Sequence, residues 1–214
     1  MMHKIWFILL AFSSVILGPA RPAAAADPHL MLADAQTVLA LTKGDQVLGS
    51  PDAPITIVEY ASLTCPHCAH FANDVLPELK KKWIDAGKVK LVFRDYPLDE
   101  PALRAAMIAR CAPADRFYAY VDTFFAQQEK WVTARDYREA LARLVRLGGM
   151  SQDAFDKCLK DTALENKILE ERLIGSKELD VNSTPTFFIN GTKFTGAPTV
   201  EEFDKVLSGL SAKS

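Results

Sequence analysis

A cysteine pair at the start of a predicted helix, directly after a predicted strand, constrains this chain more than any other stretch. Residues 55–60 are mostly β-branched or aromatic and follow turn residues at 49–52, a pattern typical of a strand. A helical pattern then runs from the motif Cys65-Pro66-His67-Cys68 to about residue 82. Pro66 suits the first helical position, because its φ is already helical and its missing N–H leaves no bond unmade. We therefore expect Cys65 immediately before the first turn of this helix.

This position gives Cys65 the chemistry of a nucleophile. Unpaired N–H groups and the helix dipole favour an anion at a helix N-terminus, so they lower the pKa of a thiol there. His67 can add a donor or a positive charge beside the thiolate. Cys68 lies one turn further on, where it can close a small disulfide with Cys65 or resolve a mixed one. The motif predicts redox chemistry, with a structural disulfide and half of a zinc site as alternatives.

Zinc is the better of these two alternatives, because two cysteines and two histidines fall within residues 65–70. A structural zinc site, however, normally takes its ligands from two separate segments. The sequence has no second CxxC motif and no paired-histidine segment. We therefore predict no metal site and no cofactor other than the cysteine pair.

The first 26 residues predict a secretory signal peptide. A weakly basic start precedes an apolar stretch at 5–18, and Ala24-Ala25-Ala26 offers a small-residue cleavage site. The apolar stretch is short for a membrane span, and an uncleaved anchor is the alternative. Residues 27–214 would then form one folded domain in the periplasm. In such an oxidising compartment, the 4 cysteines most simply make two disulfides.

The charge of the chain argues against a nucleic-acid partner. Its 25 basic and 27 acidic side chains give a net charge of −2, and no basic stripe is present. The 214 residues, 49% of them hydrophobic, are enough for one domain with a substantial core.

The segments around the cysteine pair predict a βαβ unit. A second strand at 89–93 follows the helix, and this order is typical of a parallel strand pair. Pro77 falls inside the helix and should kink it. Before this unit, residues 27–43 predict a helical extension and residues 46–48 a short edge strand.

From about 98 to 180 the sequence predicts helices and no strand. The helices are expected at 101–112, at 117–128, around 141–145, after Ser151 and at 163–179. A hairpin follows at 186–194, since Asn190-Gly191 lies between two short strand patterns. Thr199 opens the last helix with a capping box. The predicted order is βαβ, helical block, β-hairpin and helix.

This order, the CPHC motif and the segment Ser183-Thr184-Pro185-Thr186-Phe187-Phe188 together resemble the DsbA-like thiol:disulfide oxidoreductases. The resemblance covers nearly the whole mature chain from about Gly49. It implies an α/β thioredoxin-like fold, in which an all-helical insertion interrupts a domain with a central mixed sheet. It also implies that Cys65 is the attacking cysteine, that Cys68 resolves, and that His67 stabilises the Cys65 thiolate.

The resemblance assigns roles outside the motif as well. Pro185 matches the family's cis-proline, and a cis bond would turn the Thr184 backbone toward the disulfide, where it can pair with an extended substrate; a trans proline is the alternative. Glu59 matches the family's buried proton-relaying acid, although a solvated strand glutamate is the other reading. Cys111 and Cys158 are expected to form a structural disulfide, as in some members, with two buried free thiols as the alternative.

The activity implied by the resemblance is that of an exported enzyme that introduces disulfides into other proteins. Its partners would be unfolded, cysteine-containing clients and a membrane quinone-linked protein that re-oxidises it. Thr184 leaves an isomerase or reductase open, because disulfide isomerases share this residue whereas many strong oxidases carry Val. The segment before Gly49 is too short for the dimerisation domain of such isomerases, which favours a monomer. A metal-binding protein that holds a soft ion with Cys65 and Cys68 is the alternative from a different class.

Overall fold

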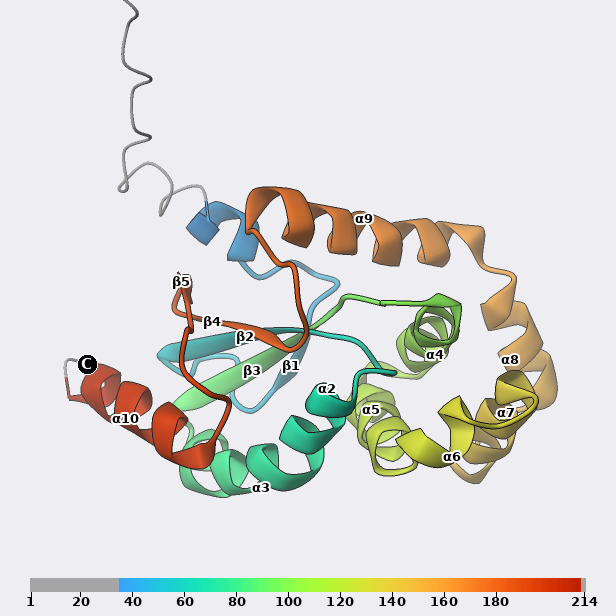
Figure 1. Ribbon diagram of the computed structural model, residues 1–214, viewed down its shortest axis with the longest axis horizontal. Helices are drawn as coiled ribbons and strands as arrows, with labels where there is room; N and C mark the ends of the chain where they lie inside the picture. The colour runs from blue at the N-terminus through green and yellow to red at the C-terminus, as the bar shows by residue number, and fades with distance from the viewer. Residues whose placement is uncertain (1–34, 213–214) are drawn as a thin grey trace, which may run out of the picture.

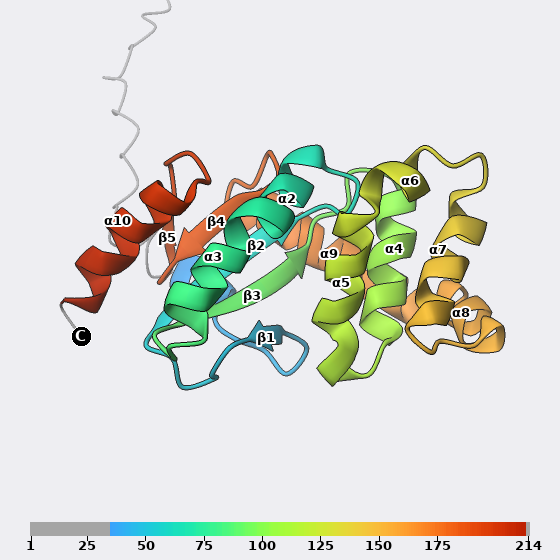
Figure 2. The ribbon, with the colours of Figure 1, turned by 90° about the horizontal axis from the view of Figure 1, so that it is seen from below.

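A mixed sheet forms the centre of the protein, with helices on both faces and a block of helices beside it (Figures 1 and 2). The structure, a computed structural model, describes residues 35–212. The predicted signal peptide, residues 1–26, and the start of the predicted helical extension lie outside the described residues. Residues 35–39 are helical. The predicted α/β architecture with a helical insertion is confirmed.

Strand β2 is the central strand of this sheet. The order is β1-β3-β2-β4-β5, in which β2 pairs with β3 in parallel and with β4 antiparallel. The predicted hairpin joins β4 to β5, and Asn190 and Gly191 both have the positive φ that its turn requires. The strands are β1 (Gln46–Leu48), β2 (Ile55–Ala61), β3 (Val89–Asp95), β4 (Thr186–Ile189) and β5 (Thr192–Lys193).

Alternation along β2 divides the core into two layers. Ile55 and Ile57 pack into the layer beneath the helix that continues from α2 (Pro66–His70) through α3 (Leu76–Leu79), and beneath α10 (Val200–Ser211). Val58 and Tyr60 pack on the opposite face, toward the end of α9 (Thr162–Glu178). Because Glu59 follows Val58 in this alternation, its side chain points to the same face as Ile57. That face carries the cysteine-bearing helix.

The helix after the cysteine pair is irregular at the place where Pro77 was expected to kink it. Pro77 lies at the start of α3, and π-helical turns at Phe71–Val75 and Lys80–Ile84 precede and follow that segment. Proline has no N–H to donate, so the backbone around it takes up a wider turn. The irregularity leaves the apolar face intact, since Phe71, Val75 and Leu79 are all buried.

The insertion consists of the predicted helices, with one difference. The helix expected at 117–128 is divided at Gln127, where the backbone leaves the helical region (φ −111°, ψ 15°). Side chains cap four of the helices, as Asp99, Asp136, Ser151 and Asp161 accept backbone N–H groups. The helices are α4 (Glu100–Cys111), α5 (Phe117–Ala126), α6 (Gln128–Val132), α7 (Tyr137–Leu147), α8 (Gln152–Leu159) and α9.

Buried ion pairs fasten the insertion to the end of β3. Arg94 contacts Asp45 at 3.2 Å, and Arg110 of α4 contacts Asp95 at 2.6 Å. Glu171 of α9 accepts the backbone N–H of Asp95 at 3.0 Å, and burial raises its pKa to about 7. The sequence analysis did not predict these contacts. They join two helices of the insertion, α4 and α9, and the segment before β1 to one strand end, so they help to set the position of the insertion.

A disulfide joins α4 to α8 within the insertion. Cys111 and Cys158 are bonded, with an S–S distance of 2.10 Å, as the family resemblance implied. The bond closes a loop with a sequence separation of 47. Among residues 35–212, no helix is long and apolar enough to cross a bilayer.

We expect removal of this disulfide to destabilise the fold without changing the cysteine pair at 65 and 68. Closing a loop of this length restricts the unfolded chain by roughly 4 kcal/mol in the chain-entropy model. Urea unfolding of Cys111→Ser/Cys158→Ser should therefore show a loss of stability of that order. Cys65→Ser/Cys68→Ser is the matched control and should keep this contribution. An unchanged unfolding free energy in the first variant would contradict the expectation.

Candidate redox site

The cysteine pair lies where β2 ends and the chain turns into α2 (Figure 2). Cys65 is the N-cap residue of α2 with an extended backbone (φ −79°, ψ 121°), and Pro66 occupies the start of the helix. The Cys65 side chain is 6% exposed, Cys68 is fully buried, and both thiols are free. The structure thus places these three residues where the sequence analysis expected them.

The surroundings of Cys65 favour its thiolate. A hydrogen bond from the Cys68 thiol is the largest effect, and it helps to lower the pKa of Cys65 to about 5. Contacts with Thr184 and with the N–H groups of Cys68 and His67 act in the same direction, while burial opposes them. The pKa of Cys68 is raised, chiefly by burial and then by its bond to Cys65. At neutral pH one sulfur is an anion and the other keeps its proton.

His67 stabilises the Cys65 sulfur through its backbone in this structure. The N–H of His67 is one of the groups that lower the pKa of Cys65. Its side chain is exposed, and the described residues offer it no hydrogen-bond partner. The stabilising role expected of the imidazole therefore stays a prediction.

The loop before β4 brings Thr184 against the nucleophile. The Thr184–Pro185 peptide bond is cis, and the Cys65 Sγ lies 3.3 Å from the Thr184 carbonyl, to which the thiol donates. The two residues are 119 positions apart in the chain. The Thr184 Oγ1 is buried, and no partner for it is found within the described part of the chain. The backbone of Thr184 therefore lies beside the reacting sulfur, as the resemblance implied.

Glu59 is a buried acid beneath the cysteine pair. Its side chain is only 2% exposed, so the alternative of a solvated strand glutamate is wrong. Burial, and then the charge of Cys65, raises its pKa to about 8. No group in the part of the chain that the structure describes hydrogen-bonds its Oε1. A carboxyl in this state holds a proton near neutral pH within the field of both cysteines.

Four polar residues hold the loop that carries Cys65, and the sequence analysis assigned none of them to the site. The Ser62 hydroxyl accepts the N–H of Leu98 and lies 3.2 Å from the Thr64 hydroxyl. The Thr64 hydroxyl donates to Asp99, which also caps α4. Gln128 of α6 donates to two carbonyls of the loop. Asp99 alone had a local signal, its position just before a predicted helix.

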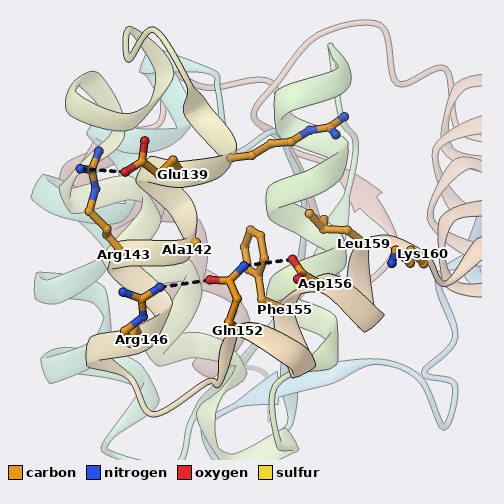
Figure 3. A pocket seen from close by; sticks show the side chains of 10 residues that line it. Glu139, Ala142, Arg143, Arg146, Gln152, Phe155, Asp156, Leu159 and Lys160 are labelled. Carbon is orange, nitrogen blue, oxygen red and sulfur yellow. Dashed lines mark hydrogen bonds and ion pairs between the residues drawn. The ribbon is translucent and has the colours of Figure 1, made fainter.

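A groove between α7 and α8 lies apart from this site (Figure 3). Several of its polar groups contact one another: Arg143 pairs with Glu139 at 3.3 Å, and Arg146 donates to the Gln152 side chain at 3.1 Å. None of the predicted site residues lines it. Among residues 35–212, no cluster of three or more His, Cys, Asp or Glu side chains is arranged to hold a metal ion.

The fold and the cysteine pair define the class of protein. A sequence profile of the thioredoxin family matches residues 41–208. The crystal structure of alpha-DsbA1 from Wolbachia pipientis superposes with a TM-score of 0.78 at 33% identity, over 84% of this chain and 96% of that one. The chain belongs to the thioredoxin family and, within it, to the DsbA-like proteins.

Curated relatives agree with this assignment. A Rickettsia bellii protein, provisionally named a protein-disulfide oxidoreductase, is 36% identical over 154 residues, which are 72% of this chain and 60% of that protein. A Bacillus anthracis protein, provisionally named disulfide bond formation protein D, is 31% identical over 157 residues, 68% of this chain and 70% of the relative. This chain thus spans about 60% of the length of the Rickettsia relative.

We expect Glu59 to make the stability of the reduced protein fall as the pH rises. Its pKa is raised from 4.5 to about 8, so the folded state holds a proton that the unfolded state releases between these values. Relative to Glu59→Gln, the wild type should lose about 3 kcal/mol of unfolding free energy between pH 4.5 and pH 7. Glu178→Gln, on the exposed side of α9, is the matched control. Parallel stability curves for wild type and Glu59→Gln would refute the raised pKa.

Proposed function

We propose that the protein is a thiol:disulfide oxidoreductase that introduces disulfides into other proteins through Cys65 and Cys68. The observation that carries this proposal is the opposite protonation of the two sulfurs. Cys65, with a pKa of about 5, is a stable thiolate and hence a good leaving group, whereas the pKa of Cys68 is raised. Stabilisation of the reduced pair in this way favours transfer of the disulfide to a client.

The exchange has two steps. A client thiolate attacks the Cys65 sulfur of the Cys65–Cys68 disulfide, which forms a client–Cys65 bond and releases Cys68. Cys68 leaves as a thiolate and takes up a proton, which the nearby Glu59 carboxyl is placed to supply. The client's second thiolate then attacks its own first sulfur and releases Cys65 as the thiolate. The client loses two electrons and the cysteine pair gains them.

The client is proposed to bind as an extended segment along the Thr184 backbone. The distance of 3.3 Å from the Thr184 carbonyl to the Cys65 Sγ supports this placement. A main-chain contact of this kind recognises backbone and not a particular side chain, so it suits clients of many sequences.

Export and re-oxidation complete the proposal. Residues 1–26 are proposed to direct the protein to the periplasm as a signal peptide, and the mature protein to act as a monomer. A membrane quinone-linked protein is proposed to return the cysteine pair to the disulfide. The sequence of residues 1–26 supports export, and the DsbA-like family of the chain supports re-oxidation by such a partner.

Equilibrium with glutathione buffers of stepped ratio, followed by mass-tagging of Cys65, tests whether the protein is an oxidase. As an oxidase, the protein keeps Cys65 reduced until the buffer is strongly oxidising, and the oxidised protein converts a dithiol peptide to its disulfide. Cys65→Ser is the control that should abolish this transfer. A disulfide that already forms in a reducing buffer would instead favour an isomerase or reductase, as Thr184 alone suggested.

We also expect the thiolate of Cys65 to stabilise the reduced protein as the pH rises. Its pKa is lowered from 9.0 to about 5, so the contribution is complete above pH 9 and is lost as the pH falls through 5. At pH 7 the contribution is about 2 kcal/mol, allowing for solvent near the sulfur.

Urea unfolding of the reduced protein at several pH values measures this contribution. The difference between wild type and Cys65→Ser should grow between pH 5 and pH 9. Cys68→Ser is the matched control, because its hydroxyl can still donate to Cys65 and should preserve the trend. A difference that does not vary with pH would exclude a stabilised thiolate.

A further inference from the structure

Helix α6 of the insertion contacts the cysteine-bearing loop through one amide group. The Nε2 of Gln128 donates to the carbonyl of Leu63 at 2.8 Å and to the carbonyl of Cys65 at 3.0 Å. A glutamine amide has two N–H groups, so both of its donors are used on this loop. The insertion therefore holds the loop at two peptide units with a single side chain.

These two peptide units lie on either side of the nucleophile. The carbonyl of Leu63 precedes the Thr64–Cys65 segment, and the carbonyl of Cys65 follows it. The N–H of Cys65 is itself bonded to the Ser62 carbonyl at 3.0 Å. Because peptide units are planar, the bonds to the Cys65 N–H and to the Cys65 carbonyl restrict the two dihedrals of Cys65, which are −79° and 121°. The bond to the Leu63 carbonyl holds the peptide unit that precedes them. These dihedrals direct the sulfur toward the start of α2.

Gln128 is well placed to impose this restraint because its own helix is held firmly. The chain leaves the helical region at Gln127, so Gln128 is the first residue of a new helix. One turn on, Trp131 is fully buried and donates from its ring N–H to the Phe124 carbonyl at 2.8 Å. The side chain therefore extends from a rigid support, and its contacts do not depend on a mobile loop.

We propose that Gln128 is a positioning residue for disulfide exchange, which holds the Leu63 and Cys65 carbonyls so that the sulfur faces the N-terminus of α2 and the Thr184 carbonyl. This inference rests on the proposed function, and it assigns the helical insertion a role in positioning the Cys65 sulfur. The Cys65 carbonyl also accepts the Ala69 N–H at 3.1 Å, so loss of the two donors would loosen the Cys65 backbone without freeing it, and would weaken the contacts of its thiolate. The insertion would stay docked in such a variant, because Asn73 of the cysteine-bearing helix still donates to the Phe125 carbonyl at 3.3 Å.

The test compares Gln128→Met, which has a similar length but no donor, with the matched control Gln127→Met. Among the described residues, the Gln127 side chain hydrogen-bonds only with the exposed Lys130. Thiolate absorbance gives the pKa of Cys65, and glutathione buffers give the redox equilibrium. For Gln128→Met we expect a higher thiol pKa and a shift of at least about threefold toward the disulfide, since the charge-assisted contacts of the thiolate with the start of α2 are weakened. Gln127→Met should match the wild type in both.

Thermal unfolding of the oxidised and reduced forms separates positioning from general stability. A Gln128→Met variant that loses stability equally in both forms, with the wild-type thiol pKa and equilibrium, would overturn the inference. Gln128→Glu is a second variant whose carboxylate cannot donate to the carbonyls and adds a negative charge. It should raise the thiol pKa further, and a wild-type pKa in this variant would also overturn the inference. The wild-type values alone test the proposed function, so the two proposals can fail separately.

Discussion

The pairing of β2 with strands on both sides is the constraint on which the site depends. This strand carries Glu59 in its middle and ends just before Cys65, while its antiparallel partner β4 follows directly from Pro185. The parallel partner β3 holds the helical insertion at its end through the ion pair of Asp95 with Arg110. The register of one strand therefore determines where Glu59, Cys65 and the Thr184 backbone lie relative to one another.

Burial is the main cause of two of the pKa shifts at this site. Removal from water raises the pKa of both Glu59 and Cys68, because each becomes an anion on losing its proton. Cys65 experiences the same penalty, but donors from Cys68 and from the start of α2 outweigh it. The ordinary order of these groups is thus reversed: the carboxyl of Glu59, whose usual pKa is 4.5, has a pKa of about 8, and the thiol of Cys65, whose usual pKa is 9.0, has a pKa of about 5.

Local chemistry made much of the fold predictable. Pro66 at the start of a helix, Asn190-Gly191 in a hairpin and Thr199 at an N-cap each act through neighbours in the chain, so the sequence is enough to identify them. The cis form of Pro185 and the bond between Cys111 and Cys158 depend on distant segments and were implied only by resemblance to a family.

Contacts between residues that are far apart in the chain could not be predicted from local sequence patterns. The burial of Glu59 was implied only by the family resemblance, because it depends on what covers one face of the sheet, which alternation along the strand does not reveal. Gln128 was expected only as part of a longer helix, and its contact requires the break at Gln127. Arg94 reads in the sequence as an ordinary charge at a strand end, yet its partner Asp45 comes from a segment 49 residues earlier.

The separation of 119 residues between Cys65 and Thr184 has a consequence for a chain that is still being synthesised. The cysteine motif, its helix and the parallel strand pair all emerge long before the loop at Pro185. Before that loop is synthesised, the nascent chain lacks one of the contacts that stabilise the Cys65 thiolate. The edge of β2 that later pairs with β4 is also unpaired. The thiolate of Cys65 thus gains its last stabilising contact only when the loop at Pro185 docks.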